Sequence, residues 1–175
     1  MVDRRRHVRV PLNSKVIVIH NNVPKVSIMR DISISGAFIE TVDLPKIGDD
    51  VFLFFPLHHQ EKTAQTSAKV VRKIEPIMEE DTFAMPGVGV EFADIPFESS
   101  ILIEDYVVNV KYVYEELMLV TSMKDPDMKR LGQLLKKVKI DQYKDFFELK
   151  DKIKKTCYAL GILKEDGEDY GTRNG

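Results

Sequence analysis

The sequence predicts a mainly β domain, an antiparallel sandwich or small barrel, followed by helices. Short apolar runs rich in β-branched and aromatic residues recur about every ten residues as far as residue 92. Turn-forming residues separate these runs, and no helical pattern interrupts them. After Pro96 the apolar residues recur instead at spacings of three and four, which is typical of one face of a helix.

Six runs are expected to form strands, and they lie at residues 16–19, 26–29, 37–40, 51–55, 67–71 and 89–92. Asn21-Asn22, Gly48-Asp49 and Pro86-Gly87 mark turns between them. So small a sheet would leave exposed edges if it stayed open, and closure removes such edges. The pattern therefore favours a barrel over an open sandwich.

Three helices are expected after the strands. The first has an apolar stripe and Ser99 or Ser100 as its N-cap. Asp125-Pro126 predicts the start of the second helix, and the third is expected to run from about residue 141 to a stop at Gly161. The stripe has heptad-like spacing that suits helix pairing, although most of it is expected to pack within the chain. Its members are Ile103, Tyr106, Val110, Val113, Leu117 and Val120.

These patterns divide the chain into five segments. They are an arginine-rich arm (1–14), the barrel (15–97), the helix that follows it (98–120), a helical extension (121–164) and a disordered tail (165–175). Residues 1–119 carry 13 basic and 18 acidic side chains, whereas residues 120–165 carry 12 basic and 7 acidic ones. The arm is a basic exception in the acidic half, which indicates an anionic partner for it.

Composition excludes several classes of protein. The formal net charge of -2 argues against a generic nucleic-acid coat. No apolar run approaches the roughly 20 residues of a membrane-spanning helix. The single cysteine, Cys157, excludes an intrachain disulfide and is expected to be a buried, inert thiol. No phosphate-binding glycine loop, nucleophile elbow or paired metal ligands stand in the sequence, so we expect neither an enzyme nor a metal or cofactor.

Two motifs remain to be explained. The first is an Arg-x-x-x-Arg formed by Arg5 and Arg9, with Arg4 just before it. The second is Asp31-Ile32-Ser33-Ile34-Ser35-Gly36, an Asp-x-Ser-x-x-Gly between two predicted strands. Taken separately, terminal arginines are usually solvated, and such an Asp/Ser stretch is usually a turn stabilised by its own side chains.

Taken together, the sequence resembles a PilZ domain, the bacterial receptor module for cyclic di-GMP. The matching segments are residues 4–12, 31–39 and 87–92, and the resemblance covers about residues 4–118. It implies a six-stranded antiparallel β-barrel with a helix after the last strand. It also implies a non-enzymatic receptor in the bacterial cytoplasm that binds cyclic di-GMP and transmits the signal to an unknown bacterial protein partner.

The resemblance also implies a ligand site. Arginine forks onto phosphate oxygens or onto guanine O6 and N7, and a carboxylate accepts from guanine N1–H and N2–H. Arg5 and Arg9 are expected to hold phosphate and guanine, while Arg4 stacks on a base in a site suited to a stacked ligand pair. The expected cyclic di-GMP-binding residues are Arg4, Arg5, Arg9, Asp31, Ser33 and Gly36, with Gly89 as a possible member that leaves room for the bases.

Two other functions stay open. One is a PilZ-like protein–protein adaptor that does not bind nucleotide. The other, less favoured, is a nucleic-acid binder that uses the N-terminal arginines and the lysines of the last two helices, although a solvated helix face explains those lysines more simply. The sequence leaves the oligomeric state open between a monomer and a homodimer.

Overall fold

The computed structural model describes residues 7–43, 45–57, 63–79 and 82–163. The expected disordered tail therefore lies outside the described residues. The chain forms two compact units, Met1–Asn109 and Val110–Gly175, and the boundary falls within the first helix. The elements are β1 (Val10–His20), β2 (Val23–Ser33), β3 (Gly36–Glu40), β4 (Asp50–Pro56), β5 (Thr63–Ile74), β6 (Ile77–Glu79), β7 (Thr82–Ala84), β8 (Gly87–Phe92), α1 (Phe97–Ser122), α2 (Met128–Lys137) and α3 (Phe146–Ala159).

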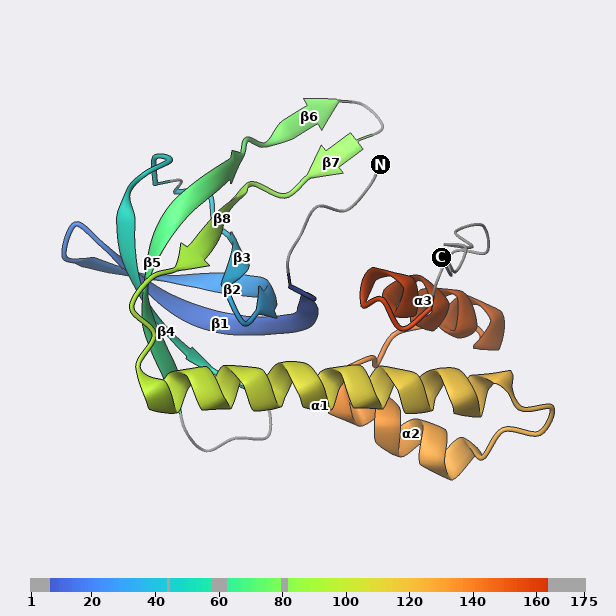
Figure 1. The fold of residues 1–175 in the computed structure, drawn as a ribbon. Coiled ribbons are helices and arrows are strands. Elements are labelled where there is room, and N and C mark those ends of the chain that lie inside the picture. The colour runs from blue at the N-terminus through green and yellow to red at the C-terminus, as the bar shows by residue number, and fades with distance from the viewer. Residues whose placement is uncertain (1–6, 44, 58–62, 80–81, 164–175) are drawn as a thin grey trace, which may run out of the picture. The chain divides into compact units, whose positions relative to one another are not determined.

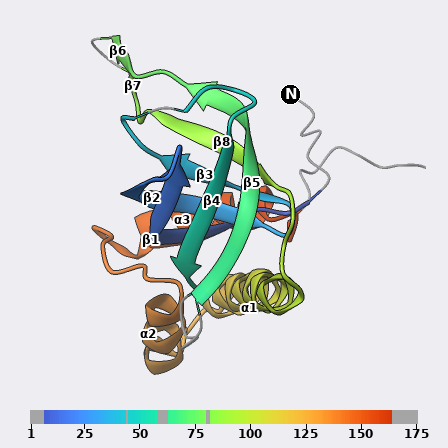
Figure 2. The ribbon, with the colours of Figure 1, turned by 90° about the vertical axis from the view of Figure 1, so that its left-hand side faces the viewer.

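Six strands of the first unit close into a barrel in the order β1-β2-β3-β8-β5-β4 (Figures 1 and 2). Every neighbouring pair is antiparallel, and β1 closes the barrel by pairing with β4. The predicted barrel is confirmed, and each of the six predicted runs lies inside one of its strands. Asn21 and Asn22, with φ of 51° and 62°, form the two-residue turn between β1 and β2.

The strands are longer than the alternation pattern predicts. β1 begins at Val10, so residues 10–14 belong to the barrel rather than to the arm. The pairing with β2 shifts between Pro11 and Ser14, and Asn13 has a φ of 48°. Such an irregularity breaks the alternation by which a strand is recognised in a sequence. The β6–β7 hairpin, which extends β5 and β8 (Figure 1), was not predicted because strands of three residues are too short to show a period.

The first part of α1 completes the core of the barrel unit. Ile103 and Tyr106 are buried, and the Tyr106 hydroxyl donates to the carbonyl of Pro11 at 2.9 Å. The predicted N-cap at Ser99 or Ser100 is wrong, because α1 begins at Phe97. Ser99 is buried instead, and its hydroxyl accepts a hydrogen bond from the Gln65 backbone N–H at 3.1 Å. This bond ties the first turns of α1 to β5.

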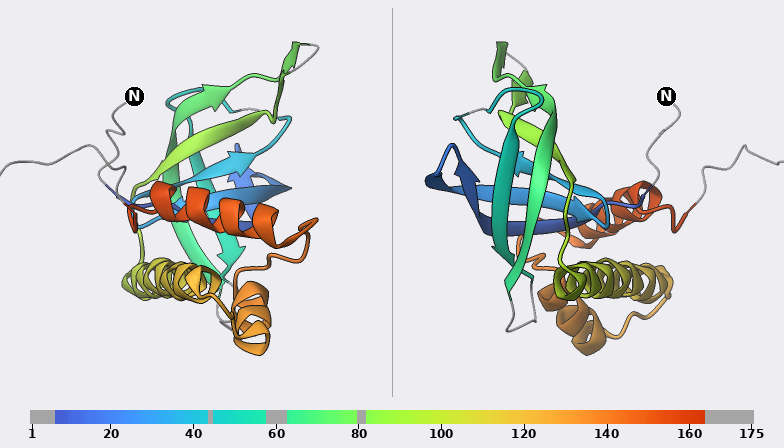
Figure 3. Two further views of the ribbon diagram at one scale, coloured as in Figure 1. Left: turned by 90° about the vertical axis from the view of Figure 1, so that its right-hand side faces the viewer. Right: turned by 60° about the vertical axis from the view of Figure 1, so that its left-hand side comes forward.

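The second unit is built from the end of α1 together with α2 and α3. These two helices lie on different sides of the end of α1 (Figure 3). The buried face of this end of α1 includes Tyr114 and Thr121, whereas the predicted stripe residues Val113 and Val120 are only half-buried. The difference arises because a straight helix repeats every 3.6 residues rather than every 3.5. The rest of the stripe is buried within the chain, so it is not a free surface for helix pairing.

Aspartates cap the last two helices, but not where the sequence pattern placed the caps. Asp127 accepts from the Arg130 backbone N–H and starts α2, two residues after the predicted Asp125. Asp145 caps α3 in the same way, so this helix begins later than predicted. The predicted stop at Gly161 is confirmed, because its φ of 65° follows the C-cap Leu160.

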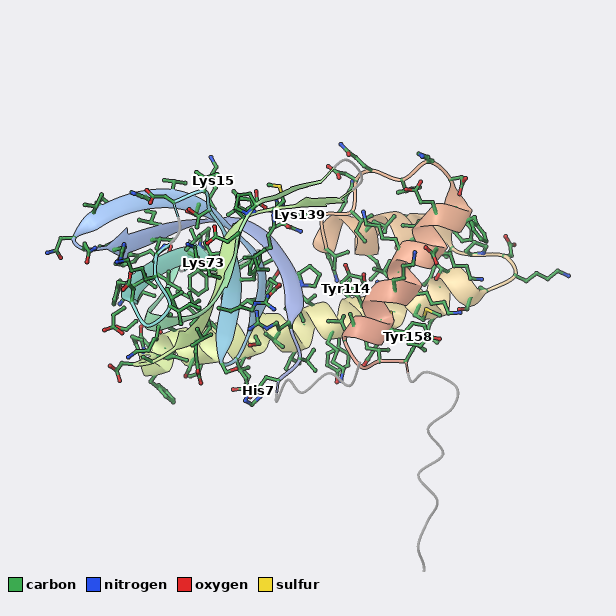
Figure 4. The ribbon with its side chains drawn as sticks, turned by 90° about the horizontal axis from the view of Figure 1, so that it is seen from above. His7, Lys15, Lys73, Tyr114, Lys139 and Tyr158 are labelled. Carbon is green, nitrogen blue, oxygen red and sulfur yellow. The ribbon has the colours of Figure 1, made fainter. Side chains whose placement is uncertain are left out.

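Cys157 is buried on α3, as predicted, and its thiol donates to the carbonyl of Tyr114 at 3.5 Å. Tyr114 on α1 and Tyr158 on α3 are labelled in Figure 4. Burial raises the pKa of Cys157 to about 11, so the residue is a protonated thiol at neutral pH. None of the helices in the described part of the chain is long and apolar enough to cross a membrane.

Candidate functional site

The two predicted motifs meet on the outside of the barrel. Arg9 lies just before β1, and Asp31 lies near the end of β2, where it pairs with Pro11. A guanidinium nitrogen of Arg9, Nη1, donates to Asp31 Oδ1 at 2.8 Å. The two side chains are 25% and 35% exposed, so the pair is accessible to a ligand. The second carboxylate oxygen of Asp31 contacts no hydrogen-bond donor among the residues that the structure describes.

Ser33 stabilises the turn that follows Asp31. Its hydroxyl donates to the Gly36 carbonyl at 3.1 Å and accepts from the Ser35 backbone N–H at 3.3 Å. The residue is 1% exposed, so its hydroxyl is enclosed by its own turn. In this arrangement Ser33 holds the β2–β3 connection in shape and thereby fixes the position of Asp31.

Gly36 is required by close backbone packing. A Cβ atom at this position would lie 2.3 Å from the carbonyl oxygen of Val90 on β8. Because the obstacle is a backbone atom of a paired strand, no side chain can be accommodated without displacing β8. Gly36 thus holds the motif turn tightly against the neighbouring strand.

Gly89 lies in a row of paired residues that crosses four strands. Asp31 on β2 pairs with Phe38 on β3, Phe38 pairs with Gly89 on β8, and Gly89 pairs with Arg72 on β5. A Cβ atom at Gly89 would lie 3.3 Å from the Arg72 Cβ. The guanidinium carbon of Arg72 lies over the Phe38 ring, 5.8 Å from its centroid. The expected member Gly89 therefore belongs to the same row as Asp31.

Arg72 and Phe38 belong to this face but are not among the residues that the sequence motifs predict. The pairing of β5 with β8 shifts register between Val70 and Arg72. As a result, the consecutive residues Val71 and Arg72 are both exposed. Simple alternation assigns one of them to the core, so the sequence pattern gives no reason to single out Arg72. Phe38 lies within the predicted strand run at residues 37–40, and nothing else in the sequence singles it out.

The expected ligand-binding residues that the structure describes do not line the hollows of the barrel near His20 and Val26. Arg4 and Arg5 lie outside the described residues. Two hollows lined by described residues, one near His20 and one between Val26 and Met85, include none of the expected ligand-binding residues. Arg9 and Asp31 therefore present an open face rather than either of these hollows. The described residues contain no group of three or more His, Cys, Asp or Glu placed to hold a metal ion.

A second ion pair involves the residue next to Asp31. Arg30, next to Asp31, pairs with Glu40 on β3 and donates to the Asn13 side chain at 3.2 Å. The two arginines therefore have different carboxylate partners: Arg30 pairs with Glu40, and Arg9 pairs with Asp31. A ligand that competes for Arg9 and Asp31 would leave the Arg30–Glu40 pair in place.

Comparisons with known proteins identify a family. The model of the PilZ domain matches residues 3–109. No curated protein has a significant match. Among solved structures, the inhibitor of motility MotI/DgrA of Bacillus subtilis is similar at 17% identity and a TM-score of 0.54, over 63% of this chain and 53% of that one.

Two further structures hold c-di-GMP. The MrkH complex from K. pneumonia is similar at 17% identity and a TM-score of 0.54, over 66% of this chain and 56% of that one. The PilZ domain of YcgR from Escherichia coli is similar at 12% identity and a TM-score of 0.51, over 65% of this chain and 96% of that domain. The chain thus spans about half the length of the Bacillus and K. pneumonia proteins. At these identities the likeness shows a shared fold.

Proposed function

Because the chain belongs to the PilZ domain family, we propose that it is a cyclic di-GMP receptor without catalytic activity of its own, acting in the bacterial cytoplasm. The observation that carries this proposal is the contact of Arg9 with Asp31, which brings the two motifs to one accessible face. Two solved structures with a similar barrel contain c-di-GMP, and this supports the choice of ligand.

Binding exchanges partners within the Arg9–Asp31 pair. A ligand phosphate or guanine O6 and N7 replaces Asp31 as the acceptor for Arg9. The N1–H and N2–H groups of a guanine replace Arg9 as the donors to Asp31. One exposed ion pair is thus exchanged for several charge-assisted hydrogen bonds, each stronger than a neutral one. Adenine has neither N1–H nor a 2-amino group, so the same carboxylate selects against it.

The other expected residues have distinct roles. Arg5 provides a second guanidinium for phosphate or guanine, and Arg4 stacks on a base so that two ligand molecules are held as a pair. Ser33 and Gly36 act mainly by shaping the turn, since the Ser33 hydroxyl is enclosed and Gly36 is packed against Val90. Gly89 supports the same face from β8.

The output of the receptor is a change in what the first unit presents to a protein partner. The segment before β1 is the part that gains contacts when Arg5 and Arg9 hold the ligand. We place the switch there because Val10 and later residues belong to a barrel strand. The partner is a bacterial protein that recognises this segment and the neighbouring face.

Calorimetric titration with cyclic di-GMP tests the function. The wild-type chain should bind, with two ligand molecules per chain if Arg4 stacks as proposed. Arg9→Ala and Asp31→Ala should each weaken binding by about tenfold to a hundredfold, as expected for lost charge-assisted hydrogen bonds. Cyclic di-AMP should not bind, and cyclic di-GMP should be recovered chemically unchanged after incubation.

Asp49→Ala is the matched control for Asp31→Ala. Asp49 lies on the same barrel, its side chain is 31% exposed, and it contacts His20 at 2.9 Å. This variant should keep wild-type affinity. The proposal is wrong if the wild-type chain does not bind cyclic di-GMP, or if Asp31→Ala and Asp49→Ala bind it equally well.

A further inference from the structure

Arg72 occupies a position that the proposed function does not explain. Its side chain crosses Gly89, with Nε 3.6 Å from the place of a Cβ there, and its guanidinium lies over the Phe38 ring. This arrangement exists because residue 89 has no side chain, since a Cβ would meet the Arg72 Cβ at 3.3 Å. Gly89 therefore positions Arg72.

The row of paired residues connects Arg72 to Asp31. Neighbouring strands lie about 4.8 Å apart, so Asp31 and Arg72 are separated by about 14 Å along the barrel wall, with Phe38 and Gly89 between them. Cyclic di-GMP carries two guanines on one closed ribose–phosphate ring. If the closed ring lies along this row with one guanine at Asp31, the ligand extends over Phe38 and Gly89 toward Arg72.

The guanidinium of Arg72 is available to a ligand. The residue is exposed, and it forms no ion pair with any carboxylate whose side chain the structure describes. Other cations of β5 differ in this respect, since Lys69 pairs with Asp50 and Lys73 pairs with Glu75. A cation held on an aromatic ring keeps one face and its N–H edge toward solvent.

We propose that Arg72, held over Phe38 across Gly89, is a further ligand-binding residue that stacks on a guanine of cyclic di-GMP. This inference rests on the proposed function and extends the site from β2 to β5. The planar guanidinium matches the flat purine, and Phe38 holds it in place before the ligand arrives. Lysine has the charge but lacks the plane, so it cannot substitute at this position.

Calorimetric titration of the full chain with cyclic di-GMP tests the proposal. Arg72→Ala should weaken binding by about threefold to thirtyfold, the range between an exposed and a desolvated cation–π contact. Arg72→Lys should lose most of the same affinity although it keeps the charge. Lys73→Ala removes a charge from the next residue of β5, labelled in Figure 4, and should bind within about twofold of wild type because that lysine is paired with Glu75.

The outcomes separate this inference from the proposed function. If Asp31→Ala weakens binding but Arg72→Ala does not, the role of Arg72 is wrong and the receptor function stands. If Arg72→Lys binds like wild type, stacking is wrong, because charge alone then suffices. If the wild-type chain does not bind cyclic di-GMP, both proposals fail together. The NMR signals of the Phe38 ring supply a second readout, and at ligand saturation they should shift less in Arg72→Ala than in the wild type, because the stacked guanidinium is missing.

Discussion

The residues of the two motifs contribute in two ways. Some hold the turn at residues 33–36 in shape, and others are proposed to contact the ligand. Ser33 and Gly36 were expected to hold a guanine edge, yet the Ser33 hydroxyl bonds within its own turn and Gly36 is pressed against Val90. Asp31 and Arg9 are the members with accessible polar groups. The expected site residues therefore fall into two groups. Arg9 and Asp31 are placed to contact the ligand, and Ser33 and Gly36 hold the turn next to Asp31 in position.

Gly36→Ala should destabilise the fold. The new Cβ would lie 2.3 Å from the Val90 carbonyl oxygen, so β3 and β8 must move apart at a cost of about 1–3 kcal/mol in the free energy of unfolding. Gly132→Ala on α2 is the control, because no atom lies within 4 Å of its Cβ position. It should stabilise the chain by about 0.5–1 kcal/mol, since alanine favours a helix interior. Denaturant unfolding measures both values, and equal stabilities would contradict the packing argument.

At the scale of elements, the sequence predicts the barrel well because an alternating pattern is a local property. All six barrel strands contain a predicted run, but β1 and β5 extend past bulges at which alternation fails. The apolar spacing predicts the three helices correctly, whereas their predicted starts are wrong. Several aspartates precede α2 and α3, and only the folded backbone decides which one caps the helix.

The part of the candidate site that contains Arg9 and Asp31 can also be predicted from the sequence, because it depends on local patterns. The Arg-x-x-x-Arg and Asp-x-Ser-x-x-Gly motifs are local, so Arg9 and Asp31 are found by reading along the chain. The contact of Arg72 with Phe38 depends on a bulge in β5 and on pairing through β8. Neither feature leaves a pattern in neighbouring residues, so this part of the face was visible only in the structure.

Asp145→Ala should weaken α3 specifically. The Asp145 side chain accepts from the Glu148 backbone N–H at 2.8 Å, and loss of an N-cap costs about 0.5–2 kcal/mol. Asp141→Ala is the control, because Asp141 is exposed and lies in the segment before the helix. Thermal unfolding should show a lower midpoint for Asp145→Ala alone. Equal midpoints for the two variants would mean that α3 does not depend on this cap.

For the whole molecule, the division into two units places the proposed ligand face within the first one. Every described residue of the candidate face, from Arg9 to Arg72, belongs to Met1–Asn109. The helices of the second unit have their own buried core, which includes Leu117, Leu134 and Ile153. The proposed ligand contacts therefore need no described residue of the second unit.

A fragment of residues 1–109 should therefore bind cyclic di-GMP within about threefold of the full chain. It retains Ile103 and Tyr106, which complete the core of the first unit. A fragment of residues 1–96 lacks both and should lose most of its stability, because burial of one such side chain contributes about 1.5–3 kcal/mol. Titration and thermal unfolding of both fragments test this division. A folded 1–109 fragment without ligand affinity would show that the second unit belongs to the binding site.

The proposed receptor function depends on binding of cyclic di-GMP by the face around Arg9 and Asp31. Amide chemical shifts of the full chain during titration with cyclic di-GMP test it most directly, because they report where the ligand lies. The largest changes are expected at Arg9, at residues 31–36, and across the row through Phe38 and Gly89 to Arg72. Changes confined to α2 and α3, or to the hollow between Val26 and Met85, would contradict this proposal, as would a spectrum that does not change.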